Sequence, residues 1–189
     1  HSGSKADAKQ SIGQIKAFGK PVLDQLGPIN YGRLNTILDM GFPKGALNYW
    51  KSCFVADLTD EVVDILKKRF LDSPSAMSKL IVERFHGAAT RYETDATAFP
   101  HRQSGYNILI IAQWMDRSGS DENVAWARDT YAALQPHMNI GVYANYMGDD
   151  ETSSRAEQAF GGNYKRLQTL KRQYDPENRF HLNQNIPPA

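Results

Sequence analysis

Tyr143 and Tyr146 have the side chains best suited to proton transfer in this sequence, and one residue between them, Asn145, adds an amide. A phenol can take the proton of a hydroxyl or amine when a neighbouring cation or a cofactor lowers its pKa. The alternative is a pair of core tyrosines whose hydroxyls are satisfied by hydrogen bonds. Residues three apart on a flat strand point to opposite faces, so the sequence leaves open which tyrosine would act.

Other polar side chains on or beside predicted strands are weaker candidates. Asn107 and Gln113 flank an aliphatic run, and we expect Asn107 to contact a small-molecule substrate. His101 precedes the same strand and is expected to fix a turn or contact substrate rather than to catalyse. Glu83 and His86 would point to opposite faces of a strand, and no third ligand is nearby, so no metal site is predicted.

The C-terminal residues 161–186 predict a short helix, a tight turn and an amide-rich tail. Asn163 is a suitable N-cap because its side chain can accept from the free N–H groups of the first turn. Asp175 precedes a proline, which ends the helix, and residues 175–178 suit a type I turn. The three adjacent amides at 183–185 suit a tail that lines a polar pocket; capping of the tail's own backbone is the alternative.

This C-terminal string resembles the signature of the berberine bridge enzyme-like flavoproteins, which are FAD-linked oxidases of the vanillyl-alcohol oxidase type. The resemblance is specific because many positions of several chemical types recur at fixed spacing. Those positions are Gly161, Asn163, Arg166, Leu167, Leu170, Lys171, Tyr174, Asp175, Pro176, Asn178, Phe180 and Asn183 to Ile186. Residues 97–102, before a strand ending at Trp114, and the Tyr-x-Asn-Tyr motif at 143–146 extend it over nearly the whole chain.

The resemblance implies roles for residues of this sequence. Tyr143 and Tyr146 would stand beside the flavin as base or substrate contact. Relatives often place an acidic or amide base in the central strand, but residues 108–111 are aliphatic here, which makes a carboxylate-assisted mechanism doubtful. The amides implied to contact the cofactor are Asn145, Asn183, Gln184 and Asn185.

The sequence shows no glycine-rich loop between a strand and a helix of the kind that holds FAD phosphates. We therefore expect residues 1–189 to be one substrate-binding domain, with the berberine bridge-like segment at 143–186, whose partner is a missing N-terminal FAD-binding domain. The intact protein is expected to transfer a hydride from a small alcohol, sugar or amine metabolite to FAD and then to oxygen. This chain alone is expected to retain FAD poorly and to be inactive.

Two alternatives belong to other classes. One is a free-standing α+β domain that binds a small ligand without flavin chemistry. The other is an unrelated α+β enzyme or small-ligand module that uses the same sheet face, with the tail as a coincidence.

Composition narrows the classes of partner. The 189 residues carry 22 basic and 21 acidic side chains, a formal charge of +1, so no nucleic-acid partner is expected. The longest apolar run, residues 108–112, suits a buried strand and is too short to cross a membrane. The single cysteine, Cys53, excludes an internal disulfide and is expected to be buried and inert. No signal peptide opens the sequence, which favours a soluble, cytoplasmic protein.

Periodicity and capping signals predict the elements that would position these residues. The expected fold class is α+β, an antiparallel β-sheet covered on one side by helices. The predicted strands are 47–55, 78–86, 106–114 and 140–146, and the predicted helices are 6–18, 31–40, a helix capped by Thr59, 121–134 and segments up to 174.

Overall fold

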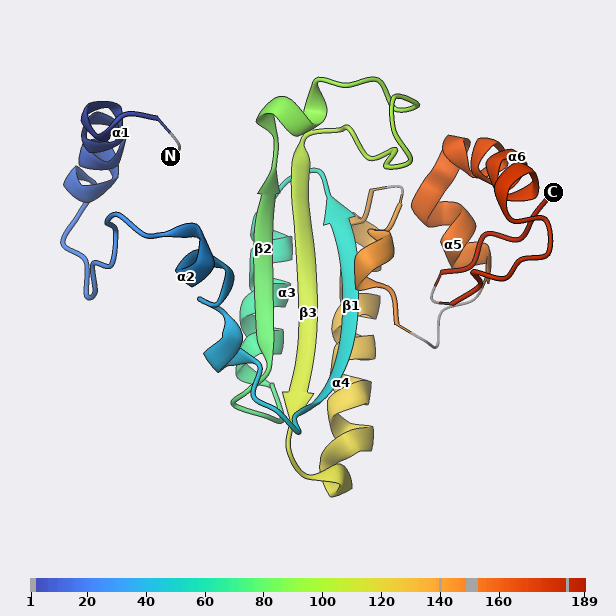
Figure 1. The fold of residues 1–189 in the computed structure, drawn as a ribbon. Coiled ribbons are helices and arrows are strands. Elements are labelled where there is room, and N and C mark those ends of the chain that lie inside the picture. Colours follow the sequence, from blue (N-terminus) through green and yellow to red (C-terminus); the bar gives the residue numbers. More distant parts are fainter. Residues whose placement is uncertain (1–2, 140, 149–152, 183) are drawn as a thin grey trace. The chain divides into compact units, whose positions relative to one another are not determined.

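The computed structural model describes residues 3–139, 141–148, 153–182 and 184–189 (Figure 1). The chain divides into two compact units, His1–Pro43 and Lys44–Ala189. Along the described ranges, no helix is long and apolar enough to cross a membrane.

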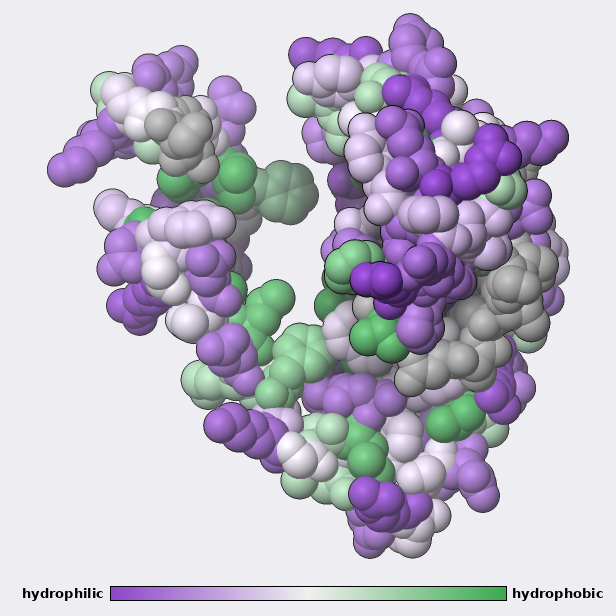
Figure 2. Space-filling view, turned by 45° about the vertical axis from the view of Figure 1, so that its right-hand side comes forward, coloured by the Kyte–Doolittle hydropathy of each residue, from purple (hydrophilic) through white to green (hydrophobic). Residues whose placement is uncertain are grey.

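The first unit contains helix α1, Lys5–Ala17, and helix α2, Tyr31–Asn35, with a 3-10 turn at Asp39–Gly41. Helix α2 is therefore shorter than the helix predicted over 31–40. At its end, the Thr36 hydroxyl donates a hydrogen bond to a backbone carbonyl of the preceding turn. None of the described residues of this unit is buried, and Figure 2 shows apolar side chains on its surface. Phe18 and Met40, for example, are 96% and 95% exposed.

The second unit is built on a three-stranded antiparallel sheet in the order β1-β3-β2. The strands are β1, Leu47–Val55, β2, Lys79–Phe85, and β3, Gly105–Trp114. The central strand is buried at every position from 107 to 114, which confirms the prediction made from its two apolar faces.

Helices α3, Asp60–Leu71, and α4, Ser120–Leu134, cover one face of the sheet (Figure 1). Helix α3 begins at Thr59, whose hydroxyl accepts from the N–H of Val62 as predicted. Successive residues of a strand point to opposite faces, so every second side chain lies in the core between the sheet and the helices. The buried core residues are Cys53, Val55, Val62, Ile108, Ile110, Ala112, Trp114, Trp126, Ala127 and Leu134. The α+β fold class, with helices on one side of an antiparallel sheet, is confirmed.

The opposite face of the sheet carries the alternate residues of β3 and has a closed polar end. Gln113 is fully buried there, accepts from Lys79 Nζ at 2.8 Å and donates to Asn48 Oδ1 at 3.0 Å. Burial lowers the pKa of the Lys79 ammonium. Gln113 therefore has a structural role at this end of the face.

The strand predicted over 140–146 is wrong at the described residues 141–146. Pairing with β1 ends at Met138, which is bridged to Val55. Beyond it, the N–H of Tyr146 donates to the carbonyl of Tyr143, and Ala144–Tyr146 forms a 3-10 turn. This backbone hydrogen bond within the segment takes the place of the hydrogen bonds that a strand would form with β1.

Helices α5, Ser153–Phe160, and α6, Tyr164–Tyr174, complete the described chain, followed by the tail. Asn163 precedes α6 but its side chain makes no capping bond, so the N-cap prediction is wrong. Its Nδ2 instead donates to the carbonyls of Thr94 at 2.7 Å and Thr97 at 3.0 Å. Asn163 thus ties the start of α6 to the loop between β2 and β3.

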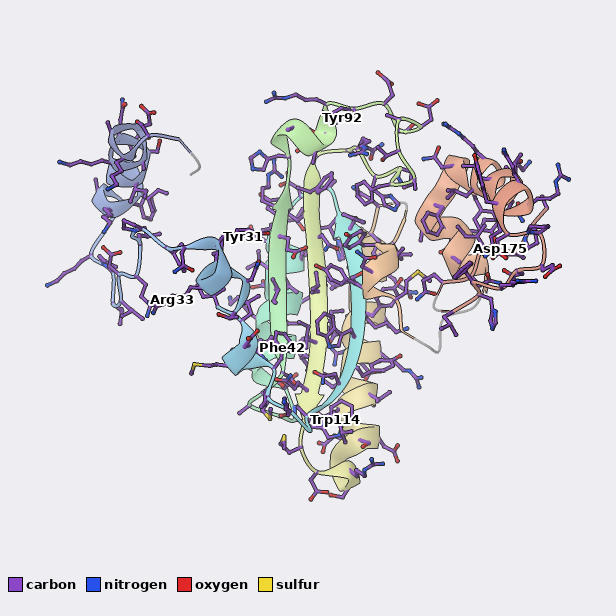
Figure 3. The ribbon with its side chains drawn as sticks, in the orientation of Figure 1. Tyr31, Arg33, Phe42, Tyr92, Trp114 and Asp175 are labelled. Atoms are coloured by element: carbon purple, nitrogen blue, oxygen red, sulfur yellow. The ribbon has the colours of Figure 1, made fainter. Side chains whose placement is uncertain are left out.

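The turn after α6 is held by one carboxylate, that of Asp175 (Figure 3). It pairs with Lys171 and accepts from the backbone N–H groups of Arg179 and Phe180. These donors lower the pKa of Asp175 to about 2, with the Lys171 hydrogen bond as the largest cause. The Lys171 side chain is only 15% exposed and lies against this carboxylate.

Candidate active site

An open pocket of about 330 Å³ lies at the end of the sheet face opposite helices α3 and α4. All three strands contribute to it, together with the loop before β3 and the segment at 141–146. The lining residues are Phe54, Glu83, Phe85, Ala89, Phe99, Arg102, Asn107 and Tyr143. Aromatic rings dominate this lining, so the pocket suits an apolar body with a few polar substituents.

Glu83 and Asn107 form the polar part of the pocket. They are directly opposite each other on β2 and β3, and Asn107 Nδ2 donates to Glu83 Oε2 at 2.7 Å. Asn107 is 3% exposed, and its Oδ1 is buried without a hydrogen-bond partner among the described residues. The sequence placed Asn107 among the site residues, and the structure puts it in the pocket; its contact with substrate remains a prediction.

Glu83 is the residue that sequence reasoning missed, because it was weighed only together with His86, as part of a metal or acid–base pair. The central strand indeed has no carboxylate, but the neighbouring strand supplies one at the same level of the sheet. The signal that could have revealed it is the pairing of the two strands. Aligning β2 antiparallel to β3 places Glu83 beside Asn107 on the face away from the core.

The two tyrosines lie on the same side of the sheet instead of on opposite faces. The 3-10 turn brings their rings to a centroid distance of 4.9 Å, at 85° to each other. The Tyr146 hydroxyl donates to Glu83 Oε1 at 3.4 Å, and Asn145 Nδ2 donates to the Tyr143 hydroxyl at 2.9 Å. The tyrosines therefore have unequal partners: a carboxylate for Tyr146 and an amide for Tyr143.

The environment of Tyr146 keeps its hydroxyl protonated. Burial is the largest cause that raises its pKa, and the Glu83 charge and hydrogen bond raise it further. A base that works as a phenolate needs the opposite shift. This geometry can instead pass a proton from the tyrosine to the carboxylate.

Phe99 joins the pocket wall to the tyrosine segment. Its ring lies 5.7 Å from that of Tyr143 and 5.8 Å from that of Phe85. The Arg102 guanidinium stacks over Phe99 at 5.1 Å and donates to the carbonyl of Ala89. The sequence did not single out Phe85 or Phe99, because aromatic residues in a strand and a loop are also typical of a core.

His101 lies behind this wall rather than in the pocket lining. Its Nε2 is 3.0 Å from the carbonyl oxygen of Val142 and 3.1 Å from that of Ala159. Burial lowers the pKa of the imidazole, although the two carbonyl bonds act in the opposite direction. Both hydrogen-bond partners of this nitrogen are therefore backbone carbonyls, and direct contact of His101 with substrate remains a prediction.

The amides proposed for the cofactor are only partly described. Gln184 Nε2 donates to the carbonyl of Met147 at 3.4 Å. Asn185 is half-buried, with a buried Oδ1 that has no partner in the described part of the chain. Asn145 is exposed and bonded to Tyr143, while Asn183 lies outside the described residues. Asn145 thus lies within the segment that carries both tyrosines, and Gln184 is hydrogen-bonded to the residue that follows it.

Comparisons with known proteins point to one family. The family model described as "Berberine and berberine like" matches residues 142–187. An uncharacterized FAD-linked oxidoreductase of Bacillus subtilis (strain 168), YvdP, is 30% identical over 99% of this chain and 42% of the relative. The tetrahydroberberine oxidase of Berberis wilsoniae is 27% identical over 84% of this chain and 34% of the relative.

The same fold occurs among solved structures. A variant of berberine bridge enzyme matches with a TM-score of 0.79 at 20% sequence identity, covering 100% of this chain and 45% of that chain. The chain thus spans less than half the length of the relatives and of the structure that it matches.

Proposed function

We propose that this chain, which corresponds to the C-terminal part of berberine bridge enzyme-like FAD-linked oxidases, forms the substrate side of a flavin-dependent oxidation site. The observation that carries the proposal is the hydrogen-bonded series from Tyr146 through Glu83 to Asn107 at an aromatic pocket. The substrate class is a small alcohol, sugar or amine metabolite, which loses a hydride from carbon and a proton from oxygen or nitrogen. When bound, FAD supplies the hydride acceptor and returns the electrons to oxygen.

The chain's own contribution is the transfer of the substrate proton. As the Tyr146 hydroxyl takes the proton of the substrate, it passes its own proton to Glu83, so no phenolate has to form. The hydrogen bond from Asn107 Nδ2 holds the Glu83 carboxylate in place beside the tyrosine hydroxyl. The raised pKa of Tyr146 is consistent with this relay, because the hydroxyl starts protonated.

The pocket also orients the substrate. Phe54, Phe85 and Phe99 provide an apolar wall for the body of a small molecule. Asn107 Oδ1, a buried acceptor without a partner in the described part of the chain, is satisfied when the substrate donates a hydrogen bond to it. Together these contacts would direct the reacting carbon to one side of the pocket.

The amide set fits a flavin. The edge of an isoalloxazine ring alternates N–H and C=O groups, and amide side chains offer both donors and acceptors. Asn185 has an unsatisfied buried acceptor of the kind that a ring N–H would satisfy. Asn145, Gln184 and Asn185 would hold the ring, with Asn183 as a further candidate. The phosphates would be held by an N-terminal FAD-binding domain, the partner that lies outside this sequence.

The decisive experiment uses the longer flavoprotein that contains this chain. Tyr146→Phe removes the relay hydroxyl, and we expect anaerobic flavin reduction to slow by about 100-fold. Tyr143→Phe removes one neutral hydrogen bond and is expected to slow it by less than about tenfold. Tyr174→Phe is the control, because Tyr174 is 77% exposed on α6. An unchanged reduction rate in Tyr146→Phe would show that the relay is wrong.

A second measurement concerns the chain by itself. Titration of residues 1–189 with FAD is expected to give weak binding and no oxidation of added substrate, because the phosphate-binding partner is absent. Purified chain with the yellow absorbance of tightly bound flavin would contradict this expectation without affecting the relay.

A further inference from the structure

We propose that His101 is a positioning residue that holds the Tyr143–Tyr146 segment against the pocket through one bifurcated hydrogen bond. The inference rests on the proposed function for its consequence, but its structural part concerns this chain alone.

Two backbone acceptors lie close to one nitrogen of His101. His101 Nε2 lies 3.0 Å from the carbonyl oxygen of Val142 and 3.1 Å from that of Ala159. Carbonyl oxygens only accept, so Nε2 carries the proton and donates to both. The two acceptors are 41 and 58 residues away along the chain, so the bond joins three separate segments.

The His101 ring is closely enclosed by its neighbours. Its centroid is 5.1 Å from that of Phe54 on β1 and 5.2 Å from that of Phe99 in its own loop. On a further side is Gly141, where a Cβ would lie 2.1 Å from His101 Cε1. Gly141 also has a φ of 109°, which side-chain-bearing residues rarely adopt. The backbone can approach this ring only because residue 141 is glycine.

The His101 hydrogen bond is also linked to both tyrosines. The carbonyl of Val142 belongs to the peptide bond that leads into Tyr143. The ring of Tyr143 packs edge-on against Phe99, so the loop that carries His101 contacts this tyrosine through both backbone and ring. The N–H of Tyr146 then donates to the carbonyl of Tyr143 at 3.0 Å. A shift at Val142 is therefore transmitted to both hydroxyls.

The positioning bond also explains why a strand is not needed here. Pairing to β1 ends at Met138, and Asn139 donates to the carbonyl of Phe54 at 2.8 Å. From Val142 onward, the His101 bond ties the segment to the loop before β3. Burial lowers the pKa of the imidazole, which favours the neutral ring. The two carbonyl acceptors then place its proton on Nε2.

The structural test uses this chain and needs no flavin. Nitrogen-15 NMR of the unmodified chain is expected to show His101 neutral at neutral pH with the proton on Nε2. A proton on Nδ1 would overturn the proposal without any substitution. His101→Leu removes the donor, and His101→Gln keeps an N–H donor near the position of Nε2. We expect the NOEs between the rings of Tyr143 and Tyr146, and between those of Tyr143 and Phe99, to disappear in the first variant and to remain in the second.

His181→Leu is the matched control, because His181 is exposed and contacts only nearby backbone carbonyls in the described structure. Ring NOEs that persist in His101→Leu would overturn the proposal. Their disappearance in both His101 variants would also overturn it, since packing of the imidazole rather than its bond would then hold the segment.

The functional test uses the longer flavoprotein. His101→Leu is expected to slow anaerobic flavin reduction by about 100-fold, the scale of a misplaced catalytic group, and His101→Gln to recover most of that loss. If the ring NOEs disappear in His101→Leu while flavin reduction is unchanged, the positioning bond is supported and the role proposed for the tyrosines is wrong. If flavin reduction slows but the ring NOEs stay, His101 acts by another route and the positioning proposal is wrong.

Discussion

Asn107 on the central strand and Glu83 on its neighbour are joined across the sheet by a 2.7 Å hydrogen bond from the amide to the carboxylate. This bond places a carboxylate in a pocket whose central strand contains none. Because the Tyr146 hydroxyl reaches the other oxygen of the same carboxylate, three residues from separate segments form one polar series.

The charge of Glu83 can be tested through the pKa of Tyr146. Glu83→Gln keeps the shape of the side chain but removes the charge, which is one cause of the raised pKa. We expect the Tyr146 pKa to fall towards the ordinary value of 10.0, without reaching it because burial remains the largest cause. NMR titration of the labelled tyrosine ring measures it. Asp64→Asn is the control, because the Asp64 side chain on α3 is exposed, and it is expected to leave the Tyr146 pKa unchanged.

The same substitution tests the relay in the longer flavoprotein. Glu83→Gln removes the group proposed to receive the tyrosine proton, so anaerobic flavin reduction should slow by about 100-fold. Stopped-flow absorbance of the flavin follows the reaction. Equal rates for Glu83→Gln and Asp64→Asn would exclude Glu83 from the chemistry.

A second carboxylate beside Glu83 should make the chain less stable as pH rises. In Asn107→Asp the two acids compete for one site, which raises the pKa of one of them above its value in the unfolded chain. A raised pKa contributes stability below the unfolded pKa and loses it as pH rises through the folded pKa. We expect a loss of about 1–2 kcal/mol between acidic and neutral pH, measured by urea unfolding. Asn107→Leu adds no charge, and a matching pH dependence in that variant would contradict this explanation.

His101 should give the opposite dependence. Its pKa is lowered from the ordinary 6.5 in the folded chain, so the unfolded chain binds the proton more readily. The linked stability is complete above pH 6.5 and falls as pH decreases towards the folded pKa. Comparing urea unfolding of the natural sequence with that of His101→Gln isolates this contribution. The difference in their free energies of unfolding should shrink or change sign as the solution is acidified.

A substitution at Asn163 distinguishes helix capping from hydrogen bonding to a distant loop as the role of this side chain. Serine is as good an N-cap as asparagine, so Asn163→Ser would be nearly neutral if capping mattered. The structure predicts instead a loss of about 1–3 kcal/mol, because Asn163 is buried and its side chain would lose two hydrogen bonds, to the carbonyls of Thr94 and Thr97. Chemical unfolding measures the change. Asn178→Ser is a comparison for the loss of a turn residue with positive φ, and it should leave the loop at 94–97 in place.

The sequence by itself determined the elements whose residues repeat regularly. Strand Leu47–Val55 was predicted with its observed bounds. Helix α4 begins one residue before its predicted start and carries Asp121 and Glu122 in its first turn. Local periodicity and capping chemistry control such segments, and both can be read along the chain. The family was also available from the sequence, because the spacing of residues 161–186 is a linear property.

Tertiary structure decided the features that depend on residues far apart in the chain. Glu83 enters the pocket because β2 pairs with β3 in one register, and a shift of one residue would turn it to the helix side. Tyr143 and Tyr146 share one side because the segment from 141 to 146 leaves the sheet and is held by His101, which precedes it by about forty residues. Hydrogen bonds and packing between such distant segments have no signature in local sequence. Their energies are set only when the strands and loops have been brought together.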